Sequence, residues 1–259
     1  MIDPIDYTNN LTIVTSTKDN INWVNSFLKS FYQTAYNKNI PILIVDSSTI
    51  SNHNTLLKIV KDYNNVKVIT SPHVVKHWIT DWEYGVSQCT TKYILSCHID
   101  IVFLLDYWDI KLTELLQTNV LISGATGDNK YIASSFILTT TELLQTAGFA
   151  TERLKNGTFR ESANIINLAN NRGSTLLLYC NSIQSKNSTQ YGDIFSYDNK
   201  NIYYHSYYSA RVISTTSEPI PEAEYISSKV AARNLDKIPS LLLNYLDNKS
   251  NISLIDFLN

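Results

Sequence analysis

The first hundred residues alternate between short β-branched runs and segments whose apolar residues recur at helical spacing. The β-branched runs have the character of buried strands, because they are short, apolar and rich in Val, Ile and Thr. They cover 11–15, 42–45, 66–69 and 92–97, and helical patterns lie between them near 21–31, 56–60 and 75–89. This alternation predicts an α/β fold of Rossmann-like type, with a mostly parallel sheet flanked by helices on both faces.

The second half of the chain follows a different pattern. Pro219 and Pro221 mark a boundary, and the segment beyond them carries too many apolar residues to remain in water. We therefore expect one domain over residues 1–218 and a helical extension over 219–259 that packs on the domain or forms a homodimer. Strand-like runs cover 120–124, 133–138, 175–179 and 202–205, and helical patterns cover 141–147, 161–171, 223–234 and 240–246.

The composition excludes several classes of protein. Hydrophobic residues make up 44% of the 259 residues and charged residues 17%, so the chain can bury a core. A formal net charge of −2 argues against a nucleic-acid partner. No apolar run approaches the roughly 20 residues that span a bilayer, and the N-terminus does not resemble a signal peptide. Three cysteines without CxxC spacing indicate buried thiols, so we expect a cytoplasmic protein.

Polar residues stand where three of the expected strands end: Thr15-Ser16, Asp46-Ser47-Ser48 and His98-Ile99-Asp100. In parallel sheets, ligands collect at the carboxyl ends of the strands. His98 and Asp100 are separated by one residue, so on an extended chain they point the same way, which suits a divalent cation that holds a diphosphate. No G-x-G-x-x-G or G-x-x-x-x-G-K-[ST] loop is present, which argues against a Rossmann oxidoreductase and a P-loop NTPase.

Taken in order, these segments resemble the GT-A fold of family-2 glycosyltransferases. The resemblance covers residues 10 to 210. It is carried by the opening strand and its loop (11–17), the second strand and its loop (44–49), the segment in the place of the D-x-D strand (93–100), Ala147-Gly148-Phe149 and the helix region 161–173. Two positions depart from the family pattern: His98 replaces the first D-x-D acid, and Ser162 replaces the Asp of the Glu-Asp pair.

The resemblance implies transfer of a sugar from a nucleotide-diphosphate sugar to an acceptor hydroxyl, with inversion and with Mn²⁺ or Mg²⁺ as cofactor. The acceptor could be a glycan, a lipid-linked glycan or a protein. The implied roles are catalytic base for Glu161, nucleotide binding for Thr15, Ser16, Asp46, Ser47 and Asp100, and metal binding for Asp100, His98 and His205.

Purely structural roles also stay open for these residues. Asp46 could be a turn former, and His98 or His205 could be structural histidines. Two other functions also stay open. One is a catalytically inactive GT-A module for binding or assembly, which the changes at His98 and Ser162 favour. The other is a nucleotidyltransferase, although Thr15-Ser16-Thr17-Lys18-Asp19 is not the Gly-rich loop that such an enzyme would carry after its first strand.

Overall fold

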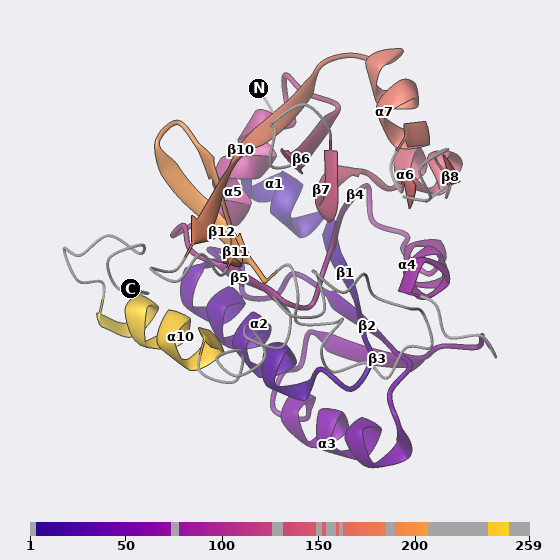
Figure 1. Ribbon diagram of the computed structural model, residues 1–259. Helices are drawn as coiled ribbons and strands as arrows, with labels where there is room; N and C mark the ends of the chain where they lie inside the picture. Colours follow the sequence, from indigo (N-terminus) through magenta and orange to yellow (C-terminus); the bar gives the residue numbers. More distant parts are fainter. Residues whose placement is uncertain are drawn as a thin grey trace.

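The computed structural model describes residues 4–73, 78–125, 132–148, 152–153, 159–160, 163–184, 190–206 and 238–248. A ten-stranded sheet runs through the molecule (Figure 1). Its strands are β1 (Leu11–Thr17), β2 (Ile42–Asp46), β3 (Val66–Thr70), β4 (Tyr93–Cys97), β5 (Ile101–Phe103), β6 (Leu121–Ala125), β7 (Ile132–Thr140), β10 (Thr175–Gln184), β11 (Gln190–Tyr197) and β12 (Lys200–His205). A separate pair consists of β8 (Glu152–Arg153) and β9 (Phe159–Arg160).

The strand order is β3-β2-β1-β4-β7-β6-β10-β11-β12-β5. The first four strands in this order are mutually parallel, as the helical connections between them require. Over the whole sheet, only β7, β11 and β5 run against the direction of the others. The expected mostly parallel α/β sheet is therefore confirmed.

Helices cover both faces of this sheet. Those described are α1 (Pro4–Asn9), α2 (Ile21–Thr34), α3 (Ile50–Val60), α4 (Trp78–Ser87), α5 (Trp108–Leu115), α6 (Thr141–Ala147), α7 (Ala163–Asn170) and α10 (Ile238–Asn248). Side chains of α2, α3, α5 and α10 belong to one apolar core, and those of α4, α6 and α7 belong to a second core. In Figure 1, α10 lies beside α2.

An aromatic cluster fixes the short strand β5 against α2. Phe27 and Phe31, one turn apart on α2, lie with their ring centroids 5.6 and 6.4 Å from that of Phe103. Trp108 of α5 stacks on the same Phe103 ring at 4.3 Å. The Phe103 N–H also donates a hydrogen bond to Ser30 Oγ at 3.1 Å. These contacts hold in place the strand that begins directly after Asp100.

A second aromatic stack fixes β12 across the sheet. The Tyr203 ring lies between those of Phe136 and Phe195, with centroids 4.6 and 4.5 Å away. Gly124 leaves room for this stack, because a Cβ atom at that position would come within 2.3 Å of the Tyr203 hydroxyl. Tyr203 precedes His205 by two residues, so the stack also fixes the end of β12.

Parts of the structure differ from the sequence-based expectations. β5 and α5 were not expected, because three apolar residues and a short amphipathic segment give weak periodic signals. The expected helix 223–234 and the boundary at residue 219 lie outside the described residues. Within the extension, α10 buries Leu242 and Leu246 against the first core, and Gln33 of α2 donates a hydrogen bond to Asp247.

The three cysteines are free and buried, as the sequence predicts. Burial raises the pKa of Cys89 to about 11, and burial together with Asp193 raises the pKa of Cys180 to about 12, so both thiols are protonated at neutral pH. Among the residues described, no helix has the length and apolar character needed to cross a membrane.

Candidate functional site

The link between β4 and β5 lies at the centre of the candidate site. It consists only of His98-Ile99-Asp100, yet it joins the fourth strand of the sheet order to the tenth. The far edge of the sheet must therefore curl back to the carboxyl end of β4. The link is held on both sides, because His98 N–H donates to the Ser135 carbonyl at 3.0 Å and Ser206 N–H donates to the Asp100 carbonyl at 3.1 Å.

Three side chains converge at this point, and we call His98, Asp100 and His205 the triad. His98 Nδ1 lies 3.0 Å from His205 Nε2 and 3.6 Å from Asp100 Oδ1. His205 Nε2 lies 3.5 Å from the same Oδ1 atom. Asp100 and His205 are buried, whereas the His98 side chain is 30% exposed. The metal-binding residues predicted from the sequence thus form one cluster, which is open on the side of His98.

The surroundings of His98 favour its neutral form. Burial lowers the pKa of His98 well below its usual range, and neighbouring His205 lowers this pKa further, while Asp100 opposes both effects. The Trp82 ring of α4 packs against His98, with the centroids 4.7 Å apart. A neutral imidazole is the form that ligates metal ions, so His98 is in the required protonation state at neutral pH.

The spacing within the triad fits a divalent cation. Ligand atoms about 2.1 Å from an ion and at right angles to each other lie about 3.0 Å apart, close to the distances between the triad atoms. Two imidazoles and one carboxylate suit Mn²⁺ and the later transition metals better than Mg²⁺, which prefers oxygen ligands. The residues present therefore fit a metal ion of the Mn²⁺ type.

The predicted nucleotide-binding residues lie at the same edge of the sheet. Thr15 and Ser16 belong to β1, Asp46 ends β2, and β1 lies between β2 and β4. Asp46 pairs in register with Thr17. Since neighbouring strands are about 4.8 Å apart, Asp46 lies about 10 Å across the edge from the end of β4. Thr15 is fully buried and presents no surface of its own to a ligand.

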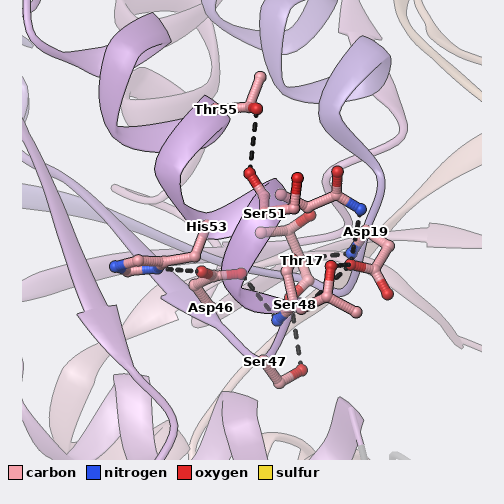
Figure 2. A network of polar contacts seen from close by, with 10 residues as sticks. Thr17, Asp19, Asp46, Ser47, Ser48, Ser51, His53 and Thr55 are labelled. Atoms are coloured by element: carbon pink, nitrogen blue, oxygen red, sulfur yellow. Dashed lines mark hydrogen bonds and ion pairs between the residues drawn. The ribbon is translucent and has the colours of Figure 1, made fainter.

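Asp46 is buried and already has partners within the protein (Figure 2). Its Oδ2 atom lies 2.6 Å from His53 Nδ1 on α3, and its Oδ1 atom accepts the Ser48 N–H at 3.0 Å. Each carboxylate oxygen can accept a second hydrogen bond, so these contacts leave capacity for a ligand. His53 was not among the residues predicted from the sequence. Its signal was a histidine in the first turn of the helix that follows the Asp46 loop.

The loops after β1 and β2 are tied together. Ser47 N–H donates to the Thr17 carbonyl at 3.0 Å, and Asp19 N–H donates to Ser48 Oγ at 2.7 Å. Asp19 in turn holds the start of α3, because its Oδ1 atom accepts the N–H of Thr49, which precedes the helix, at 2.9 Å and the Asn52 Nδ2–H at 2.8 Å. Figure 2 shows this network beside Asp46. The two loops therefore form one rigid wall of the candidate site.

Glu161 and Ser162 lie outside the described residues, so the role of Glu161 stays a prediction. Asp109, in the first turn of α5, is fully buried, and its two oxygens accept the N–H groups of Tyr36 and Asn37, each at 2.8 Å. It stabilises the chain after α2 and takes no part in the triad.

No protein-family model matches the chain, and no similar sequence was found among curated proteins. Its structure is similar to the mannosyltransferase PcManGT from Pyrobaculum calidifontis, determined with GDP-Man and Mn²⁺, with a TM-score of 0.54 and 10% identity over 70% of this chain. It is also similar to TarS of S. aureus, with a TM-score of 0.55 and 11% identity over 92% of this chain. A TarS 1–349 structure with UDP-GlcNAc gives a TM-score of 0.55 at 10% identity.

The chain spans 59% of the PcManGT chain and 43% of the longer TarS chain. At such low identity, the likeness establishes the fold alone. The chain thus has a GT-A fold, as its sequence predicts.

Proposed function

We propose that the protein transfers a sugar from a nucleotide-diphosphate sugar to an acceptor hydroxyl on a glycan, a lipid-linked glycan or a protein. The observation that carries this proposal is the triad, because its three ligand-type side chains suit a cation and lie at the carboxyl edge of a GT-A sheet, beside the loops of β1 and β2. PcManGT with GDP-Man and Mn²⁺ and TarS with UDP-GlcNAc support the same class of donor. We further propose a cytoplasmic location, in line with three buried free thiols.

Each part of the site has a proposed task. Asp100, His98 and His205 hold the cation, for which Mn²⁺ is favoured over Mg²⁺ by the two imidazoles. Such an ion, when bound, neutralises the charge of the leaving diphosphate. Asp46 accepts a hydrogen bond from the base or ribose, Ser47 and Ser16 line the nucleotide, and Thr15 supports this edge of β1 from below.

The acceptor side of the site rests on the family resemblance. An inverting displacement needs a carboxylate on the face opposite the diphosphate to deprotonate the attacking hydroxyl. We assign this role to Glu161, because Ser162 has no useful basicity at neutral pH. A second candidate function is an inactive GT-A module that binds a nucleotide sugar without transferring it. The replacement of an acid by Ser162 favours this alternative.

A panel of nucleotide sugars tests the proposal. The protein is incubated with UDP-, GDP- and dTDP-sugars in Mn²⁺, in Mg²⁺ and in EDTA, and both thermal shift and release of free nucleotide are measured. The proposed enzyme should be stabilised by one donor class through mass action, and it should release nucleotide fastest in Mn²⁺. Binding without release, also after candidate acceptors are added, would favour the inactive module. No binding to any donor would overturn both functions.

A further inference from the structure

Helix α4 contains a buried carboxylate that the site described above does not use. Asp81 is 2% exposed, and its Oδ1 atom has no hydrogen-bond partner within the described part of the chain. A carboxylate withdrawn from water without a donor is costly, and proteins rarely keep one unless a ligand or ion completes it. A ligand that could donate a hydrogen bond to Asp81 would therefore complete this carboxylate.

Gly85 defines the face of α4 on which Asp81 lies. A Cβ atom at Gly85 would lie 2.7 Å from Val14 Cγ1 of β1 and 2.7 Å from Val45 Cγ2 of β2. This face of α4 therefore rests directly on these two strands. Asp81 precedes Gly85 by four residues, so its side chain is on the same face, one turn nearer the start of α4.

The direction of α4 places that turn at the candidate site. α4 connects the parallel strands β3 and β4, so it runs against the strands, and its N-terminal turn lies toward their carboxyl ends. One helical turn is about 5.4 Å, or between one and two strand residues. Ser16 and Ser47 lie two residues beyond Val14 and Val45 along the chain, so they are on the same face of the sheet and about one helical turn nearer its carboxyl edge.

The residue next to Asp81 supports this placement. Trp82, also in this turn of α4, packs its ring on His98 of the triad at 4.7 Å. Asp81 and Trp82 point about 100° apart around the helix axis, so Trp82 faces the end of β4 while Asp81 faces the ends of β1 and β2. Asp81 thus lies at the nucleoside end of the proposed donor site and away from the diphosphate end.

We propose that Asp81 is a donor-binding residue whose buried oxygen accepts a hydrogen bond from the nucleoside part of the nucleotide sugar. This inference rests on the proposed function. A carboxylate only accepts hydrogen bonds, so its partner must be a donor group. Nucleosides offer the imino N–H of uracil, thymine or guanine, the exocyclic amino groups of guanine, adenine and cytosine, and the ribose hydroxyls. We assign the contact to the imino N–H or to a ribose hydroxyl; cytosine and adenine lack the imino N–H. A site that depends on one rejects the base without it, because the carboxylate then stays unpaired.

The test compares Asp81→Asn and Asp81→Ala with wild type, and Asp62→Asn serves as an exposed control outside the site. Calorimetry measures the affinity for UDP and GDP in Mn²⁺, and melting without nucleotide measures stability. We expect both Asp81 variants to melt at or above the wild-type temperature, because an unpaired charge is removed, and to bind nucleotide at least tenfold more weakly. Asp62→Asn should match wild type in both measurements.

Two further ligands identify the group that Asp81 contacts. CDP in place of UDP, or ADP in place of GDP, removes the imino N–H, and the 2′-deoxy nucleotide removes a hydroxyl. Wild type should bind either the base-changed nucleotide or the 2′-deoxy nucleotide more weakly than the parent nucleotide, and Asp81→Asn should reduce that difference. The nucleotide for which the difference shrinks identifies the group that Asp81 contacts. Unchanged affinity in Asp81→Asn, or a lower melting temperature in both variants with affinity retained, would overturn this inference alone. Failure of the wild type to bind any nucleotide would overturn the proposed function and this inference with it.

Discussion

His98 Nδ1 and His205 Nε2 lie 3.0 Å apart, although 107 residues separate these histidines in the chain. The contact exists because β5, which follows the triad link, pairs antiparallel with β12. In this pairing Ile101 lies opposite His205. Either histidine alone could be structural. Their convergence with the Asp100 carboxylate on a partly open cluster is the arrangement that a cation would stabilise, since the cluster offers three ligand atoms to one point.

The triad predicts that Asp100→Asn loses the metal. Asn keeps the size of Asp but removes its negative charge and weakens the only oxygen ligand of the cluster. Mn²⁺ affinity, measured by calorimetry without nucleotide, should fall by more than about tenfold, with the fold retained. Asp62→Asn, a change in an exposed turn, is the matched control and should bind as wild type does. Wild-type Mn²⁺ affinity in Asp100→Asn would remove Asp100 from the site.

Asp46→Ala should weaken nucleoside diphosphate binding by about 1–3 kcal/mol, the cost of a lost hydrogen bond in a buried site. This variant also deprives His53 and the Ser48 N–H of their partner, so it should lower stability as well. His53→Ala separates the two effects, because it removes the same internal contact but keeps the carboxylate. It should lose stability and retain most of the affinity, as measured by melting and calorimetry. Equal losses of affinity in the two variants would contradict direct contact by Asp46.

Asp19 should stabilise the wall of the site in a pH-dependent manner. Burial alone would raise the pKa of Asp19, but hydrogen bonds from Asn52 and Thr49 outweigh burial and lower this pKa. A lowered pKa in the folded state means that the stabilisation is full above the unfolded value of about 3.9 and is lost as the pH falls through the folded value. Asp19→Ala should therefore cost about 1 kcal/mol at pH 7, the usual net contribution of a hydrogen bond, and progressively less below pH 3.9.

Asp19→Asn serves as the control for that experiment. Asn keeps one acceptor oxygen for the Thr49 N–H but carries no charge, so it should lose less stability than Ala and show no titration. Denaturant unfolding at several pH values gives the comparison. A difference between wild type and Asp19→Ala that stayed constant from pH 7 to pH 3 would show that the charge of Asp19 does not contribute.

The sequence predicted the parallel half of the sheet and the triad, but not the way in which the triad is assembled. Strands such as Ile42–Asp46 are apolar and bounded by turn residues, so their pattern is visible locally. The three-residue strand Ile101–Phe103 carries no periodicity, and its partner lies about a hundred residues away, so pairing with β12 could not be read from the sequence. His53 and Asp81 were missed for the same reason, since helix packing alone brings them to the sheet edge.

Glu161→Gln should reduce turnover by about 10²–10⁴-fold if Glu161 is the general base, since Gln keeps the shape but cannot take the proton. Donor binding should survive, because the acceptor carboxylate does not hold the nucleotide. Glu152→Gln, the next nearest acid along the chain, should retain activity and serves as the control. Near-normal turnover in Glu161→Gln, measured as sugar transfer at saturating donor, would place the base elsewhere.

The C-terminal helix α10 should contribute to the stability of the domain through one face only. Leu242 is fully buried against the core that includes α2, whereas its neighbour Leu241 is 36% exposed. Leu242→Ala should lower the free energy of unfolding by about 2–4 kcal/mol, from lost burial and the cavity left behind, while Leu241→Ala should change it by less than about 0.5 kcal/mol. The two variants alter the same helix by the same atoms, so helix propensity cancels in their comparison. Equal stability of the two variants in denaturant unfolding would mean that α10 does not pack on α2 in solution, and the extension would then be free to bind a second subunit.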